Sequence, residues 1–305
     1  MYSFLVSTRK ELTLDWQSQL IRTYIIVCNA FENSVGNTVH RHSNNFKFKL
    51  SDEEVMTIYL FGIFSGHSTT RNIFNYFSQH LKNWFPNLGG YEAFNYRLNR
   101  IANGFESFCM HLLENHPELA ASDLSRFVVD SAPIVLARAS RSKRAKVAKE
   151  LADKGYCSSK DLFFHGVKLH CIGICRESKI PKPCFIGVFP ASTNDNQALK
   201  QISPELINCE LFGDKAYEDA AHKKQLLENQ DTTLITPRKK SKNLFNFLGD
   251  DTFSSWVSSI RQPIESFFNW LQEKTKIQNA SKVRSAAGLK VHVFGRLATA
   301  LLCFS

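Results

Sequence analysis

The sequence lacks any apolar run long enough to cross a bilayer. Its longest apolar stretches, at Val55–Phe64 and Leu297–Phe304, fall well short of the roughly 20 residues that a transmembrane helix needs. The segment Met1–Arg9 also lacks the long apolar core of a secretory signal. We therefore expect a cytoplasmic protein with no membrane partner.

The sequence also offers little support for zinc or disulfide chemistry. None of the eight cysteines has a Cys-x-x-Cys partner, which argues against a zinc finger. In the cytoplasm the thiols are expected to stay reduced. No internal repeat or low-complexity tract is present, and 43% hydrophobic against 22% charged residues is typical of a globular chain. A hydrophobic core, rather than cross-links, must hold this fold together.

Positive charge is in clear excess. The chain carries 38 Lys and Arg against 28 Asp and Glu, a formal net charge of +10. Such an excess favours a polyanionic partner, because neutralising phosphates releases condensed counterions. Nucleic acid is the commonest partner of this kind. Charge alone leaves open a protein that is merely basic.

Residues 1–120 have the pattern of a helical region. Ser51-Asp52-Glu53-Glu54 has the sequence of a capping box directly before the apolar run at Val55–Phe64. Apolar faces recur elsewhere in this region at helical spacing, and core packing explains them. We assign residues 1–120 to a helical N-terminal region.

Residues 121–305 have a different pattern, in which strands come first and then alternate with helices. Enrichment in β-branched residues and flanking polar links predict strands at Phe127–Leu136, His165–Cys175, Cys184–Phe189, Leu211–Asp214 and Thr233–Thr236. Helices are predicted at Asn196–Leu206, Asp219–Asn229 and Ser254–Phe304, the last with a break near Ser285–Gly288. This order predicts an α/β (mixed α+β) domain with helices on both faces of a mixed sheet.

Three acidic residues stand where a cleft could expose them. Asp130 and Asp214 each end a predicted strand, and Glu265 lies on a predicted helix. Three carboxylates can hold two Mg²⁺ ions, which prefer oxygen ligands and promote in-line displacement at phosphorus. Each aspartate alone is equally explained as a turn or cap residue, and Glu265 as an i,i+4 ion pair with Arg261. Spacing does not decide between these explanations.

Several segments resemble the catalytic domain of DDE transposases of bacterial insertion sequences. Among these transposases, the segments are most similar to those of the insertion-sequence 982 family. The resemblance covers about residues 50 to 304 and rests on Leu50–Asn99, Phe127–Ile134, Phe164–His170, Leu211–Tyr217 and Arg261–Lys276. It implies an RNase H-like catalytic core with a five-stranded mixed sheet. It also implies DNA-end binding by the N-terminal region.

The resemblance implies a metal-dependent enzyme that cuts and joins DNA. Asp130, Asp214 and Glu265 would be the catalytic metal ligands for two Mg²⁺ ions, for which Mn²⁺ can substitute, and Arg261 would lie near DNA phosphate. Its partners would be double-stranded DNA and a second copy of the chain. In the cytoplasm it would associate with the bacterial nucleoid. One departure is Gln272, which stands where the family usually has a lysine. Gln272 keeps open a catalytically impaired DNA-binding protein as an alternative. A second alternative is an RNase H-like nuclease that hydrolyses DNA without joining it.

Basic residues flank the expected cleft and are candidates for DNA contact. Lys168 and His170 share one face of a predicted strand near Asp130, where they are expected either to contact DNA or to support the metal ligands from behind; a solvated face is the alternative. Asp195, in a polar turn, is expected to be a helix cap rather than a metal ligand. Three further basic tracts, each alone explained as a solvated face, contribute the candidates Arg141, Lys143, Arg144, Lys239, Lys240, Lys274 and Lys276.

Overall fold

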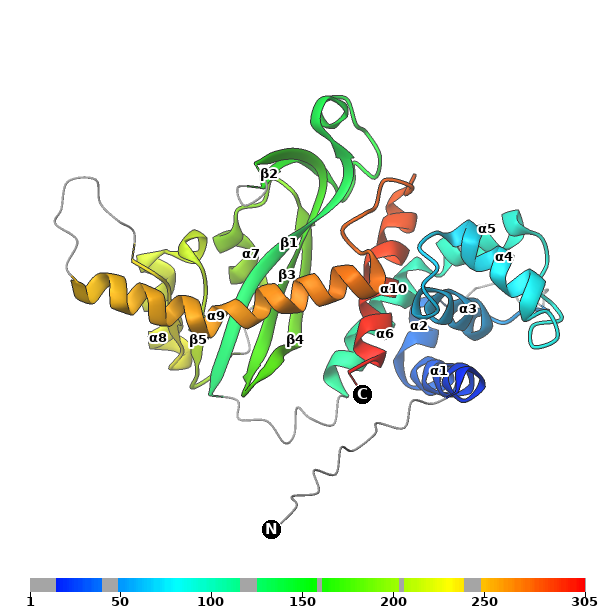
Figure 1. Cartoon of the computed structure of the whole chain (residues 1–305), viewed down its shortest axis with the longest axis horizontal. Helices are drawn as coiled ribbons and strands as arrows, with labels where there is room; N and C mark the ends of the chain where they lie inside the picture. The colour runs from blue at the N-terminus through cyan, green and yellow to red at the C-terminus, as the bar shows by residue number, and fades with distance from the viewer. Residues whose placement is uncertain are drawn as a thin grey trace, which may run out of the picture.

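The computed structural model describes residues 15–39, 49–115, 125–157, 161–202, 206–238 and 248–304. Two parts of the structure lie side by side in Figure 1: a mixed sheet with its own helices, and a bundle of helices at one end. The helix α9 (Leu248–Thr275) crosses the sheet and reaches the bundle. Across the residues that the structure describes, no helix has both the length and the apolar character needed to cross a membrane.

The bundle begins with the N-terminal helices. They are α1 (Trp16–Ala30), a π-helical turn (Phe31–Val35), α2 (Gly36–Val39), α3 (Asp52–Phe64), α4 (Thr70–His80), α5 (Tyr91–Arg100) and α6 (Ala102–Glu114). The predicted capping box starts α3: the Ser51 hydroxyl accepts from the Glu54 amide at 3.2 Å, and the Glu54 carboxylate accepts from the Ser51 amide at 2.6 Å. Residues 55–63 of α3 are buried on every side, which places α3 at the centre of the bundle.

The C-terminal helix α10 (Ala286–Leu302) also belongs to this bundle. It packs mainly against α6 and α3, and a Cβ on Gly295 would lie 2.6 Å from the Tyr59 ring. This close approach explains the glycine. The helical bundle therefore combines residues from both ends of the chain. An apolar helix can pack on either part, so its sequence pattern does not reveal its partner.

The sheet is built around β1 (Arg126–Arg138). Its strand order is β2-β3-β1-β5-β6, and β4 pairs with the part of β3 that β2 leaves uncovered. β1 runs antiparallel to β3 and parallel to β5, which is parallel to β6. The other strands are β2 (Asp153–Cys157), β3 (Leu162–Arg176), β4 (Lys179–Pro190), β5 (Glu210–Phe212) and β6 (Thr233–Ile235).

The mixed sheet is confirmed, but within the described residues it has six strands rather than the five expected. The additional strand is β2, whose sequence Asp-Lys-Gly-Tyr-Cys lacks the apolar alternation that marks a strand. β2 forms because the start of β3, residues Leu162–Gly166, extends beyond β4 and offers its unpaired backbone groups to β2.

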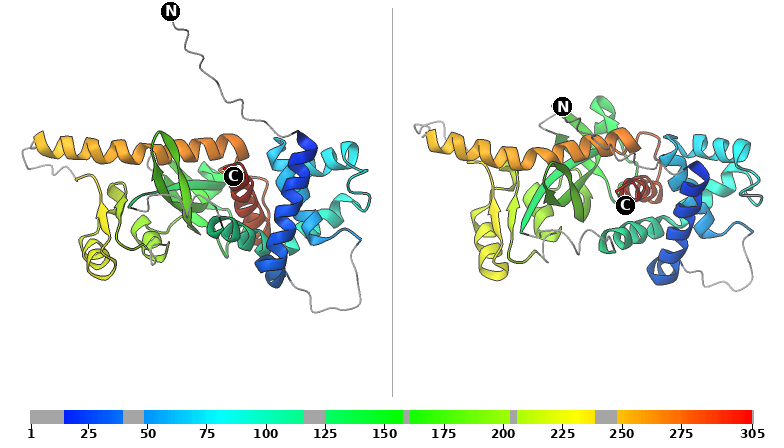
Figure 2. Two further views of the ribbon diagram at one scale, coloured as in Figure 1. Left: turned by 90° about the horizontal axis from the view of Figure 1, so that it is seen from below. Right: turned by 60° about the horizontal axis from the view of Figure 1, so that its bottom comes forward.

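Helices cover both faces of the sheet, as predicted. α9 lies on one face, and α7 (Asp195–Ile202) and α8 (Ala220–Gln230) lie on the other (Figure 2). The alternation of β1 follows this division: Val128 packs in the core on the α9 side, whereas Phe127 and Val129 pack with α7 and α8. Asp130 has the same parity as Val128 and therefore faces α9.

Candidate active site

Asp130 lies in the middle of β1 beneath α9. One of its carboxylate oxygens accepts from the Ser131 amide at 2.8 Å, and the other accepts from Arg261 Nη1 at 3.1 Å. Only 19% of the Asp130 side chain is exposed. A carboxylate at this depth is costly unless a cation or several donors compensate it, so the position calls for a function.

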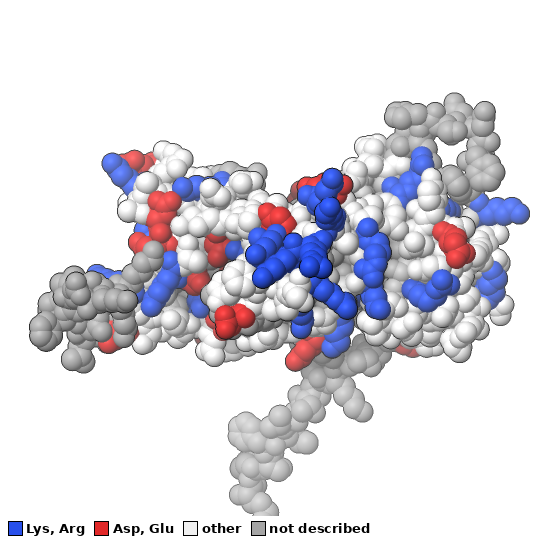
Figure 3. All heavy atoms as spheres, turned by 90° about the horizontal axis from the view of Figure 1, so that it is seen from above, with Lys and Arg blue, Asp and Glu red and all other residues white. Residues whose placement is uncertain are grey.

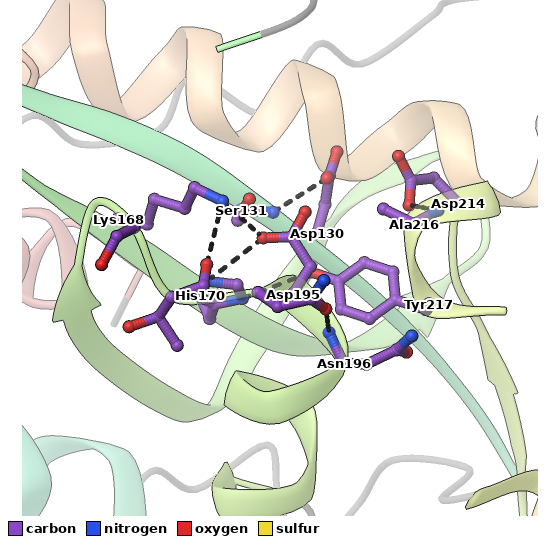
Figure 4. Close-up of polar contacts among 12 residues, drawn as sticks. Asp130, Ser131, Lys168, His170, Asp195, Asn196, Asp214, Ala216 and Tyr217 are labelled. Carbon is purple, nitrogen blue, oxygen red and sulfur yellow. Dashed lines mark hydrogen bonds and ion pairs between the residues drawn. The ribbon is translucent and has the colours of Figure 1, made fainter. Parts of the chain in front are cut away.

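Asp214 follows β5 and lies beside Asp130. Parallel pairing places Phe212 opposite Val128, so each aspartate comes two residues beyond a paired position. The Asp214 carboxylate accepts from the Ala216 amide at 2.7 Å and thereby caps a short 3₁₀ turn. Figure 4 shows both aspartate side chains reaching toward α9.

Glu265 enters the site from α9. Arg261, one turn earlier, donates to Glu265 at 3.0 Å through Nη2 while its Nη1 binds Asp130. The i,i+4 ion pair weighed from the sequence is therefore present. The same guanidinium also joins the helix to β1 across the interface.

Burial and mutual repulsion disturb the ionisation of the aspartates. Burial is the main cause that raises the pKa of Asp130 to about 7; Arg261 opposes it, whereas Asp214 and Glu265 add to it. Burial also raises the pKa of Asp214, against hydrogen bonding by the Ala216 amide and the charge of Arg261. The charge of Arg261 thus acts on three neighbouring acids, and it does not balance their combined negative charge.

A divalent cation fits the chemistry of these side chains. Carboxylate oxygens are the ligands that Mg²⁺ prefers, and a bound dication would favour the ionised form of Asp130. Among the described residues, however, no three His, Cys, Asp or Glu side chains lie close enough together to hold a metal ion. Arg261 lies between Asp130 and Glu265 and keeps these two carboxylates apart.

A cleft of about 920 Å³ opens beside the acids, between α9 and the segments that follow β5 and β6. Asp214, Arg261 and Glu265 line it, together with four serines of α9, at positions 254, 255, 258 and 259. A polyanion entering this cleft would meet serine hydroxyls, Lys215 and Arg261 as well as the acids, whose negative charge bound metal ions would offset.

Lys168 and His170 both have partners inside the fold. Lys168 donates to Asp195 at 2.9 Å, so its charge is already compensated. His170 is fully buried, with Nδ1 3.3 Å from the Tyr217 hydroxyl, and its burial lowers its pKa to about 4. A buried, neutral histidine cannot reach a DNA phosphate, which argues against the contact expected for it. Nor does Asp195 cap α7: the Asn194 side chain accepts from the Asn196 amide instead.

Tyr217 is a neighbour of the site that the sequence did not single out. It is 1% exposed, and Asp130, Asp195 and Asp214 all add to the raising of its pKa, which burial dominates. Its hydroxyl therefore stays protonated beneath the acids. No sequence signal separates such a tyrosine from an ordinary core residue.

The other basic candidates are exposed where the structure describes them. Arg141, Lys143 and Arg144 lie in the connection between β1 and β2, and Lys274 and Lys276 lie at the end of α9. Figure 3 shows Lys and Arg gathered over the middle of one face. Lys239 and Lys240 lie outside the described residues.

Gln272, in place of a lysine, has a structural partner. Its side-chain oxygen accepts from the Gln278 amide at 2.9 Å and so holds the turn after α9. A lysine has no acceptor with which to make this bond.

Comparison with protein families matches residues 122–286 to the transposase DDE domain. The match spans more than half of the chain and contains Asp130, Asp214, Glu265 and Arg261. The chain therefore belongs to the transposase DDE domain family, whose members typically use a divalent metal ion. A comparison with curated proteins found no match.

Proposed function

We propose that this protein is a transposase that cuts DNA at the ends of a bacterial insertion sequence, of the 982 family, and joins the ends to new DNA. Asp130, Asp214 and Glu265 are its catalytic residues and the ligands of two Mg²⁺ ions, for which Mn²⁺ can substitute. The observation that carries the proposal is the buried Asp130, held beneath α9 with Asp214 and Glu265 around a single arginine.

The strand order supports an RNase H-like core for this domain. Leaving β2 aside, the order β4-β3-β1-β5-β6 has an antiparallel half and a parallel half that meet at β1. Ligands of open sheets gather where strand connections change direction, and β1 and β5 flank this point. Asp130 lies on β1, and Asp214 comes two residues after the end of β5.

In the proposed reaction, water attacks a phosphorus atom and the 3′ oxygen leaves, which produces a 3′-hydroxyl. That hydroxyl attacks a phosphodiester of the target, so one P–O bond forms as another breaks and no other energy source is needed. Bound Mg²⁺ ions supply activation of the attacking oxygen and stabilisation of the leaving oxygen. The chain's part is to hold three carboxylates at fixed positions: on β1, directly after β5, and on α9.

Arg261 has two roles in this proposal. It neutralises Asp130 and Glu265 while no metal ion is bound, which limits their repulsion. When the carboxylates bind Mg²⁺ instead of Arg261, the planar guanidinium is free to bind a DNA phosphate with two N–H donors.

The assay that tests the function uses a duplex with a pre-cut 3′ end and a supercoiled target plasmid, with Mg²⁺. The wild-type protein should join the end to the plasmid, and Asp214→Ala should not, although both bind the duplex. Glu228→Ala, an exposed acid on α8, is the control and should keep activity. Hydrolysis without joining would identify a nuclease, and binding without any cutting would identify an impaired DNA-binding protein.

Two further proposals concern assembly. Cutting both ends of an element together requires two active sites, so we propose a homodimer in the active complex. We also propose that the protein associates with the nucleoid, since its partner is chromosomal DNA.

A further inference from the structure

A second cleft, of about 870 Å³, lies between the bundle and the segment that joins α9 to α10. One wall comes from the starts of α4 and α5 and includes Arg71 and Asn95. The other wall comes from residues 276–288 and includes Lys276, Lys282 and Arg284. The cleft therefore brings together two parts of the chain that are far apart in sequence.

The lining of this cleft is suited to an anion. It contains four exposed cations, Arg71, Lys276, Lys282 and Arg284, and no aspartate or glutamate. Within the described part of the chain, none of the four forms an ion pair with a carboxylate. Ligand sites for apolar small molecules are lined mainly by hydrophobic side chains, whereas most residues that line this cleft carry a hydroxyl, an amide or a positive charge.

The cations on the two walls are partly preorganised. The Arg71 guanidinium lies 3.4 Å from the centre of the Tyr91 ring, a stacking arrangement that leaves its N–H edges available. Arg284 Nη1 donates to the carbonyls of Ser281 and Val283, both at 2.8 Å, which fixes the side chain and leaves its other nitrogens available. Cations held in place in this way lose less side-chain entropy on binding.

The base of the cleft is rigid. Arg296 of α10 is 3% exposed and donates to the Ser68 carbonyl at 2.6 Å and to the Thr275 carbonyl. His292 Nε2 lies 2.8 Å from the Ile277 carbonyl. These bonds join α10, the start of the α4 wall and the end of α9, so the two walls keep their separation.

The cleft is also fixed relative to the acidic site. The Val135 amide donates to the Gln278 carbonyl at 2.9 Å, and the Ala280 amide donates to the Val135 carbonyl at 3.1 Å. Val135 and Asp130 lie on the same strand, so about 17 Å separates them along β1. One nucleotide of a DNA strand spans about 3.4 Å, so the separation of Val135 and Asp130 corresponds to about half a helical turn of a duplex.

We infer that this cleft binds the phosphodiester backbone of duplex DNA and sets the distance between that contact and the acids. The inference rests on the proposed function in that DNA is the substrate. Backbone contacts of this kind position a duplex without reading its sequence. The DNA could be the element end or the target, and the backbone chemistry is the same for both.

The test measures DNA affinity by fluorescence anisotropy in EDTA over a range of salt concentrations. One labelled duplex carries the DNA that flanks the gene, and a second has unrelated sequence of equal length. Lys282→Gln/Arg284→Gln removes charge from one wall, and Arg71→Gln removes it from the other. The matched control, Arg126→Gln/Lys179→Gln, loses the same two charges at the opposite end of the sheet, at the start of β1 and of β4.

Lys282→Gln/Arg284→Gln should weaken binding roughly tenfold near 0.1 M salt. It should also make the negative slope of log affinity against log salt less steep by about two. Arg71→Gln should make the slope less steep by about one, and the control should change neither. Equal losses for both duplexes assign the cleft to backbone contact in general, whereas a loss for the flanking duplex alone assigns it to the element end.

Two results would overturn the inference: unchanged affinity and slope in the wall variants, or an equal loss in the control. Either result leaves the proposed function standing if the wild-type protein still cuts DNA. A wild-type protein that binds neither duplex would overturn both.

Discussion

Replacing Asp130 by Asn should stabilise the fold at neutral and alkaline pH. Asn has nearly the shape of a protonated carboxyl group but cannot ionise, so it removes the cost of a buried charge. That cost is visible in the pKa of Asp130, which burial raises from an ordinary value of 3.8 to about 7 despite Arg261. A site kept for catalysis can carry such a cost, whereas a structural site gains nothing from it.

The size and sign of the effect follow from proton linkage. Between about pH 4 and 7 the folded protein holds a proton on Asp130 that the unfolded chain has lost, so wild-type stability falls by about 1.4 kcal/mol per pH unit. The stabilising effect of the raised pKa is complete below pH 3.8 and is lost as the pH rises through about 7. The total change in the free energy of unfolding from this shift is at most about 4 kcal/mol. Since the side chain keeps some solvent contact, we expect a gain of roughly 2 kcal/mol or more for Asp130→Asn at pH 8.

The assay is chemical denaturation of both proteins without divalent ions at pH 4, 6 and 8. Subtracting the two curves cancels the titration of all other groups to first order. The difference should be small at pH 4 and grow to its full value by pH 8. A difference that stays constant across this range would refute the buried, repelled carboxyl described for Asp130.

Three other substitutions test separate parts of the account. Asp214→Asn should lower DNA cleavage by roughly 10²-fold or more, measured in a gel assay, with DNA affinity changed little, because it removes a metal ligand rather than a DNA contact. Arg296→Met should destabilise the protein by roughly 2–5 kcal/mol in guanidinium unfolding, since the carbonyls of Ser68 and Thr275 lose their donors. Ser51→Ala should cost about 1 kcal/mol in the same measurement, because the α3 capping box loses its hydroxyl acceptor; no loss there would mean that solvent replaces the cap.

The sequence predicted the sheet well because its strands carry strong local signals. The strands β1, β3, β5 and β6 were predicted close to their observed bounds. β4 starts five residues earlier than predicted, at Lys179 instead of Cys184, because the segment expected to be a polar link pairs with the end of β3. β2 was missed because pairing with β3, rather than its own residues, makes it a strand. The grouping of α10 with the N-terminal helices was missed for a similar reason, since an apolar helix carries no record of the surface that it covers.

The arrangement of the candidate site was only partly predictable. The strand-end position of Asp214 and the pairing of Glu265 with Arg261 are local features of the sequence. Asp130 was expected at a strand end, but it lies within β1, because pairing with β3 continues that strand to Arg138. The contact of Arg261 with Asp130 joins residues 131 positions apart and depends on how α9 crosses the sheet. Alternation placed Lys168 and His170 on one face of β3, but helices cover both faces of this sheet, so the shared face gave no solvent exposure to His170.

The most direct test of the central claim is the position of Mn²⁺ in a crystal of the protein with bound DNA. The anomalous signal of manganese should appear between the carboxylates of Asp130 and Asp214, with Glu265 in contact and Arg261 displaced from Asp130. Manganese that binds elsewhere, or a complex in which Arg261 still holds Asp130 and Glu265 apart, would contradict the proposed catalytic site.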